Sequence, residues 1–158
     1  MNQDIKKNIN EIIDLINKNE IEVAKIKTEA LINQKIKNDV VYNLLGIVNL
    51  KLKNHNLAIK NFKQSLKINK NFVSALMNLA ISQKEINKYD DAITNFKKII
   101  KLNSELFEVW LEIGLLYFKQ KNYSQAIFFF TKSKELNKKF DKAYYNLGLT
   151  YLNLGNFI

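Results

Sequence analysis

The stretch that decides the fold is WLEIGLLYFKQKNYSQAIFFFTKS, residues 110–133. Its apolar residues recur three or four positions apart on either side of the polar turn QKNY. That spacing is typical of one buried face on each of two helices. A small residue in each half, Gly114 and Ala126, allows the two helix axes to approach closely where they cross. The stretch therefore predicts a helical hairpin.

The hairpin recurs along the chain with a period of 34 residues. A Gly or Ala marks each first helix, an Ala follows twelve positions later in the second helix, and a Phe follows four positions after that. The three series are Gly46, Ala80, Gly114 and Gly148; Ala24, Ala58, Ala92 and Ala126; and Phe62, Phe96 and Phe130. Three series in one phase indicate stacked hairpins, because one hairpin alone leaves an apolar face uncovered. The sequence therefore predicts an all-α solenoid.

Polar residues recur at the expected helix ends. Just ahead of the second helix, one repeat position holds Asn56, Asp90 and Ser124, which we expect to be N-caps. Where the second helix ends, one position holds Asn69, Asn103 and Asn137, which we expect in the left-handed conformation. No segment shows the period-two alternation of a half-buried strand. The expected elements are therefore helices joined by short turns.

The pattern resembles the tetratricopeptide repeat, whose signature is W-x2-L-G-x2-Y in the first helix and A-x3-F in the second. Residues 110–133 carry the closest copy, with Ile113 in place of Leu, and YYNLGLTYLNLGNF (residues 144–157) matches the first half. The family's late Pro is replaced by Lys70, Ser104 and Lys138. Its loss weakens the stop between repeats without changing the fold. The resemblance implies a right-handed superhelix of about four and a half repeats.

The resemblance covers nearly the whole chain, which we expect to form a single domain over residues 1–158. The expected full repeats are 39–72, 73–106 and 107–140, with a degenerate capping repeat at 5–38 and a half repeat at 141–158. In the capping repeat, Ile12 and Thr28 stand in place of the small residue and the Phe. The half repeat lacks a second helix. We therefore expect that the natural chain continues, or that a second copy covers this end in an end-to-end dimer.

The resemblance implies a concave groove, lined by the first helices, that binds peptides or partner proteins. The groove residues that it implies are Asn43, Ile47, Met77, Asn78, Ile81, Leu111, Glu112, Leu115, Phe118, Tyr145, Asn146 and Leu149. The apolar members form either a lining shared with the core or a floor for an amphipathic helix or extended segment. Asn78 and Asn146 resemble the asparagine ladder that holds a peptide backbone in some members of the family. A carboxamide suits that role because it both donates and accepts hydrogen bonds.

A second use known in the family is a clamp that grips the free C-terminus of a partner. That clamp needs Lys and Asn at the fifth and ninth positions of one repeat. Here those positions hold Asn43 and Ile47, Met77 and Ile81, or Leu111 and Leu115. A carboxylate buried on this apolar floor without a cation would cost several kcal/mol. The residues therefore exclude the clamp.

The sequence offers no catalytic constellation. The single His, His55, falls in an inter-helix turn, Cys is absent, and no Gly-rich loop could hold a phosphate. Glu108, Glu112 and Lys119 could gather on the first-helix face of one repeat, where we expect partner contacts or solvated charges. We therefore expect no enzyme activity, no metal and no cofactor.

The net charge is +10, from 25 basic and 15 acidic residues. Every basic residue is Lys, whereas proteins that read nucleic acids rely on the planar, bidentate guanidinium of Arg. The charge therefore favours a solvated lysine surface over a nucleic-acid site. The sequence contains neither an apolar run long enough to span a membrane nor a secretory signal, and we expect a cytoplasmic location.

Three functions remain open. The leading interpretation is a protein-interaction scaffold that binds a peptide or a partner's helix in the groove. One alternative is the N-terminal recognition arm of a longer enzyme, such as a transferase. The other is RNA binding, by analogy with helical repeats that read bases. The strict 34-residue period and the missing Arg weigh against RNA.

Overall fold

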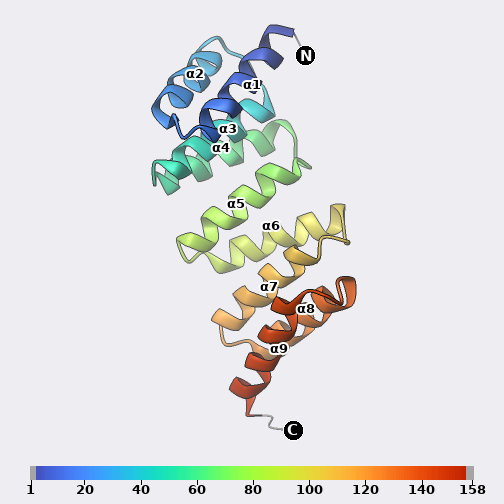
Figure 1. Cartoon of the computed structure of the whole chain (residues 1–158). Helices are drawn as coiled ribbons and strands as arrows, with labels where there is room; N and C mark the ends of the chain where they lie inside the picture. The colour runs from blue at the N-terminus through green and yellow to red at the C-terminus, as the bar shows by residue number, and fades with distance from the viewer. Residues whose placement is uncertain (1–2, 156–158) are drawn as a thin grey trace. The chain divides into compact units, whose positions relative to one another are not determined.

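The computed structural model describes residues 3–155, and in that range the chain forms nine α-helices and no strand (Figure 1). The helices are α1 Gln3–Asn17, α2 Ile21–Asn33, α3 Asp39–Lys51, α4 His55–Ile68, α5 Val73–Glu85, α6 Tyr89–Leu102, α7 Phe107–Lys119, α8 Tyr123–Leu136 and α9 Asp141–Leu154. The predicted all-α fold is confirmed. The four helices α3, α5, α7 and α9 begin one repeat period apart, as a solenoid of hairpins requires.

The chain divides into two compact units, Met1–Asn87 and Lys88–Ile158, which are described separately. In the first unit α3 packs against α2 and α4, and α5 packs against α4. In the second unit α7 packs against α6 and α8, and α9 covers α8 (Figure 1). The boundary between the units falls inside the expected repeat 73–106, between α5 and α6. A single domain over residues 1–158 stays a prediction.

The turn inside each hairpin contains a residue with positive φ. These residues are Asn19, Lys53, Asn87 and Lys121, with φ of 62°, 60°, 60° and 59°. After α3 the N–H of Lys53 donates to the carbonyl of Leu50, and the N–H of Asn54 donates to that of Asn49, both at 2.8 Å. These two hydrogen bonds close the C-terminal end of α3 around the left-handed residue Lys53. At Lys53 and Lys121 the sequence does not indicate this conformation, because Lys has no preference for it.

The predicted N-caps Asn56, Asp90 and Ser124 are wrong. Each lies in the first turn of its helix, because α4, α6 and α8 begin one residue earlier. The N-cap of α8 is Asn122, whose side-chain oxygen accepts from the N–H of Gln125 at 3.3 Å. The left-handed turn residue is followed at once by the cap, which leaves no room for the longer turn that the prediction assumed.

The predicted left-handed conformation at the ends of the second helices is also wrong. Asn69, Asn103 and Asn137 are extended, with φ of −132°, −150° and −137°. Each Oδ1 instead accepts from the backbone N–H two residues further on, at 3.2, 3.0 and 3.1 Å respectively. This is an Asx turn, in which a short polar side chain substitutes for a backbone carbonyl. The recurrent Asn therefore directs the chain from one hairpin into the next.

In two hairpins, α3–α4 and α7–α8, the core contains a Phe ring seated on a Gly of the first helix. A Cβ added at Gly114 would lie 2.6 Å from the ring of Phe130, and one added at Gly46 would lie closer still to the ring of Phe62. Both rings are fully buried. Any side chain at these two positions would overlap the ring, so the close helix crossing requires Gly. At Gly148 in α9, by contrast, an added Cβ would meet nothing within 4 Å.

The first hairpin reverses this arrangement of large and small residues. Ile12 on α1 stands at the Gly position and Thr28 on α2 stands at the Phe position, and both are fully buried. The Thr28 hydroxyl donates to the carbonyl of Ala24 at 2.6 Å, so the polar group has a partner. A large residue opposite a small one keeps the volume of the crossing roughly constant. The sequence departs from the repeat here without losing the packing.

A hydroxyl also ties the second helix to the start of the first in two hairpins. Ser65 donates to the carbonyl of Asp39 at 2.7 Å, and Ser133 donates to the carbonyl of Phe107 at 2.8 Å. Ser65 and Ser133 are fully buried, and the carbonyl at the N-terminus of the first helix gives each hydroxyl its acceptor. These bonds fix how far the two helices slide along each other.

Substitution by Ala should change the stability differently at the three glycines of the first helices. Gly46→Ala and Gly114→Ala are each expected to lower the free energy of unfolding by about 1–3 kcal/mol, because the methyl group overlaps a buried ring. Gly148→Ala is expected to raise it by up to about 1 kcal/mol, since Ala favours the helix and nothing opposes its methyl group. Urea unfolding followed by circular dichroism measures all three. Equal losses at the three positions would contradict this account of the crossing.

Candidate functional site

The predicted groove residues lie on the first helices of the two units. On α3 and α5, which pack together, the first face comprises Asn43, Ile47, Met77, Asn78 and Ile81. On α7 and α9, which also pack together, the second face comprises Leu111, Glu112, Leu115, Phe118, Tyr145, Asn146 and Leu149. Each face belongs to one unit, and a single groove along all the first helices stays a prediction.

The first face is partly a continuation of the core. Ile47 is half-buried and packs against the cluster of Ala58, Phe62 and Leu79. Met77 and Ile81 on α5 are half-buried as well. Each of these side chains therefore has one side in the protein and one side open to a ligand. These contacts fit a lining shared with the core, and a floor for a ligand stays a prediction.

The amide residues of the first face bond to each other. The Nδ2 of Asn78 donates to the Oδ1 of Asn43 at 3.1 Å. Asn43 is only 5% exposed, so its side chain has little surface to offer a ligand. The predicted ladder residue Asn78 thus serves first as the partner of a buried amide.

The residues of the second face range from buried to exposed. Leu111 is 6% exposed and packs with Ala126, Phe130 and Leu147. Leu115 and Phe118 are half-buried on the same cluster. Phe118 also approaches the ring of Tyr123, with centroids 5.6 Å apart. Leu111 is therefore a core residue, whereas Leu115 and Phe118 keep part of their surface accessible.

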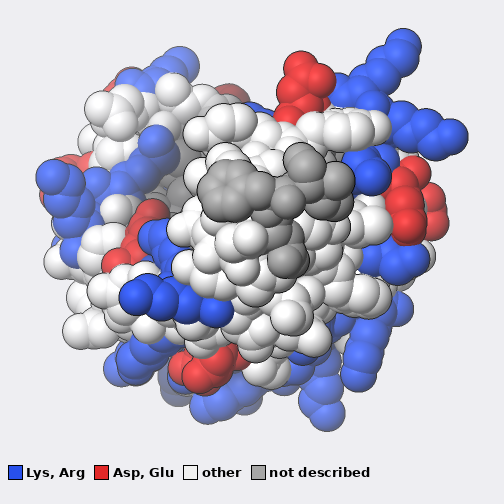
Figure 2. All heavy atoms as spheres, turned by 90° about the horizontal axis from the view of Figure 1, so that it is seen from below, with Lys and Arg blue, Asp and Glu red and all other residues white. Residues whose placement is uncertain are grey.

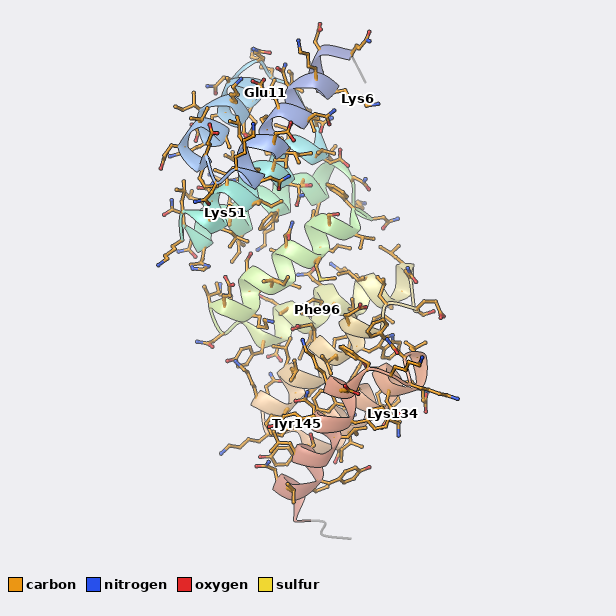
Figure 3. All side chains as sticks on the ribbon, in the orientation of Figure 1. Lys6, Glu11, Lys51, Phe96, Lys134 and Tyr145 are labelled. Carbon is orange, nitrogen blue, oxygen red and sulfur yellow. The ribbon has the colours of Figure 1, made fainter. Side chains whose placement is uncertain are left out.

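The α9 side of the second face carries its most accessible ring. Tyr145 is 71% exposed and projects from α9 (Figure 3). Leu149, one turn further along, is half-buried. Asn146 donates to the carbonyl of Lys142 at 2.7 Å within its own helix, and Glu112 is half-buried. The second face therefore has accessible apolar surface that is not buried in the core, contributed by Leu115, Phe118, Tyr145 and Leu149.

The second unit also holds an aromatic cluster that the sequence analysis only partly anticipated. The ring of Phe129 lies 5.8 Å from that of Trp110 and 5.4 Å from that of Tyr117. Lys97 lies over Tyr117 at 5.4 Å and over Phe129 at 5.6 Å, and it donates to the Tyr117 hydroxyl at 3.0 Å. The FFF run 128–130 was the available signal, because three successive Phe cannot all face one core. The outermost, Phe128, is largely exposed.

The part of the chain that the structure describes contains no cluster of metal-ligand side chains. His55, expected in an inter-helix turn, is the first residue of α4, and its Nδ1 lies 3.1 Å from the Oε2 of Glu85 at the end of α5. Among residues 3–155 no three His, Cys, Asp or Glu side chains gather as metal ligands would. Every helix in this range is too short or too polar to span a bilayer.

Family models match most of the chain. Two models described as "Tetratricopeptide repeat" match residues 107–140 and residues 40–72 and 141–157, respectively. A third, described as "TPR repeat", matches residues 83–121. A search of the curated proteins gives no match.

Solved structures resemble the chain over most of its length. MamA residues 41 to the end, from Desulfovibrio magneticus RS-1, give a TM-score of 0.88 at 17% identity, covering 99% of this chain and 88% of that one. A tetratricopeptide repeat protein from Parabacteroides merdae gives 0.87 at 23%, covering 98% and 62%. YrrB, described as a TPR protein with an unusual peptide-binding site, gives 0.76 at 18%, covering 83% and 68%. At these identities the likeness establishes the fold alone.

The hydrogen bond between Asn43 and Asn78 predicts that substitutions at these two residues have non-additive effects on the free energy of unfolding. Asn78→Leu should lower the free energy of unfolding by about 1–3 kcal/mol, because it removes the partner of the buried Asn43 amide. Adding Asn43→Leu should restore most of that loss, since neither polar group then remains buried alone. Urea unfolding of both single variants and the double variant measures the coupling. Additive losses would show that the two amides act independently.

Proposed function

Because the chain belongs to the tetratricopeptide repeat family, we propose that it is a protein-interaction scaffold that binds a peptide or a partner's helix on its first-helix faces. The observation that carries the proposal is the accessible apolar surface of the second face. There Tyr145 is exposed and Leu149 half-buried on α9, and Leu115 and Phe118 are half-buried on α7, which packs against α9. A surface of this kind suits the apolar side of an amphipathic helix or of an extended segment.

Tyr145 is the expected anchor of the interaction. A tyrosine offers a large apolar ring and a hydroxyl that can bond to a peptide, at the cost of ordering only a few torsions. Residues of this type carry much of the binding energy at many interfaces. The half-buried neighbours supply a rigid floor, because the core fixes one side of each. Preorganisation of this kind lowers the entropy that binding loses.

The charge of the chain supports an acidic partner. The net charge is +10, and the lysines that produce it are mostly exposed. A positive surface speeds encounter with acidic segments and weakens encounter with basic ones. The ligand expected on the second face is therefore a segment with an apolar stripe and a negative net charge. This function needs no catalytic group and no cofactor.

Binding by a peptide selected from a random-peptide phage library against the full chain tests the proposal. Tyr145→Glu and Met77→Glu should each weaken a peptide bound to the corresponding face at least tenfold, about 1.4 kcal/mol, because each places an unpaired charge in an apolar contact. Fluorescence anisotropy measures the affinity. Circular dichroism should be unchanged for Tyr145→Glu, whose side chain is largely exposed.

The matched controls are Gln125→Glu on α8 and Gln64→Glu on α4, which add the same charge to second helices and should leave affinity within twofold. Loss of binding in the controls but not in the face variants would overturn the proposal. Single-stranded RNA serves as the competing ligand. Tight RNA binding that falls steeply with salt concentration, with the peptides inactive, would favour the nucleic-acid alternative instead.

A further inference from the structure

The outer side of α4 forms a basic surface in the first unit. Lys60, Lys63 and Lys67 lie three and four residues apart and therefore share one side of the helix, away from its buried residues. Lys70, two residues after the helix, continues the row. All four are exposed, and we call them the lysine row. Figure 2 shows how Lys side chains of this chain stand out from its surface. Because α4 packs between α3 and α5, its outer side is the one that remains accessible.

No carboxylate of the first unit compensates the lysine row. Residues 40–84 contain no Asp or Glu, although the chain has 15 such residues in all. The two acidic residues that border this stretch have other partners. Asp39 accepts from the Nδ2 of Asn69 at 2.9 Å, and the Oε2 of Glu85 lies 3.1 Å from the Nδ1 of His55. Among residues 3–155 no ion pair involves the lysine row. The row can therefore pair with acidic groups from outside the chain.

The other second helices do not repeat the row. At the equivalent positions α2 and α8 each carry one Glu, and α6 carries only two Lys. A lysine content set by composition alone would not favour one second helix. Like charges three and four residues apart also repel each other and lower the stability of a helix. The row therefore destabilises the free protein slightly, and the acidic groups of a partner relieve that repulsion.

Apolar surface lies near both ends of the row. Leu57 is 50% exposed and Ile68 is 44% exposed. The two are eleven residues apart, so they lie on the same side of α4, about three turns from each other. Beside Leu57 the surface is hollowed, and the hollow has a volume of about 330 Å³ and is lined by residues 53–57 and Ile86. That volume is at the small end of the range of ligand pockets and accepts one large side chain.

The second unit fills the corresponding place with its own residues. There the Oδ1 of Asp90 at the start of α6 accepts from the Nε2 of Gln120 at the end of α7, at 2.8 Å. In the first unit these two repeat positions hold Asn56 and Ile86, and an Ile side chain cannot form that hydrogen bond. The hollow beside α4 therefore follows from a difference in sequence between the two repeats.

We propose that the outer side of α4 binds an acidic amphipathic helix of a partner protein. Carboxylates three and four positions apart on that helix pair with the lysine row. An apolar side chain at one end of the helix enters the hollow beside Leu57, and another, eleven positions away, rests on Ile68. This surface belongs to a second helix and is separate from the first-helix faces, so the inference is independent of the function proposed above.

An acidic helix matches this surface better than a nucleic acid or a second copy of the chain does. Every cation of the row is a Lys, a compact point charge that pairs with a single carboxylate, whereas phosphate recognition favours the bidentate fork of Arg. The apolar residues near both ends of the row suit the apolar side of a helix. A second copy would bring the same net charge of +10, and like charges oppose association.

A synthetic helix supplies the probe. It is an alanine-based peptide with Glu at successive spacings of three, four and three, which match the lysine row, and with two Leu eleven positions apart on the adjacent side. Saturable binding to the full chain is expected in fluorescence anisotropy, with an affinity that falls as the salt concentration rises. The same peptide with Gln in place of Glu should bind at least tenfold more weakly. Equal affinity of the two peptides would overturn the proposal.

Matched triple variants locate the site. The first neutralises the three lysines of the row that lie within α4 and should weaken the probe at least tenfold: Lys60→Gln, Lys63→Gln and Lys67→Gln. The control removes the same charge from three exposed lysines of the second unit and should change affinity less than threefold: Lys98→Gln, Lys101→Gln and Lys139→Gln. Equal losses in the two triple variants would show a response to net charge alone and would overturn the site.

Two further measurements test the chemistry of the surface. The α4 triple variant should unfold at the same or a higher urea concentration than the unchanged chain, because it removes repulsion, so its weaker binding would not reflect a damaged fold. Leu57→Gln should weaken the probe at least threefold, and unchanged affinity would contradict the use of the hollow. Single-stranded RNA is the competing ligand. RNA that binds more tightly than the probe, and no longer binds the α4 triple variant, would replace the acidic helix with a nucleic acid.

Discussion

The contact between a Gly on the first helix and a Phe ring on the second is the constraint on which the hairpins α3–α4 and α7–α8 depend. Phe62 on Gly46 and Phe130 on Gly114 leave no space for a Cβ, so the two helix axes cross at their closest approach at this point. Once the crossing is fixed, the hydroxyls of Ser65 and Ser133 can reach the carbonyls at the start of the first helices. The first hairpin shows that shared volume is what matters, because Ile12 opposite Thr28 preserves it with the sizes exchanged.

The same crossing decides which surfaces remain for binding. A second helix covers one side of each first helix and leaves another side facing outward, where Ile47, Leu115 and Phe118 lie half in the core and half accessible. Such residues stabilise the fold and also keep part of their surface accessible. On α9 the described residues leave Tyr144 and Tyr151 partly exposed.

Much of the fold could be predicted because the packing of the repeats depends on residue sizes that recur at a fixed spacing in the sequence. The helix ends were harder, since a recurrent polar residue has several possible uses. Asp90 is an example: it stands where a cap was expected, yet it lies inside α6 and its Oδ1 accepts from Gln120 at 2.8 Å. The recurrent Asn103 likewise forms an Asx turn with Glu105 rather than a left-handed end. Composition alone cannot tell these roles apart.

The sequence by itself determined the helices, their pairing and the face on which each residue falls, because those depend on period and on local size. The tertiary structure decided how much of each side chain stays accessible. Asn43 and Leu111 share a repeat position with Tyr145, yet the first two are buried and the third is exposed. Their neighbours on adjacent helices make that difference.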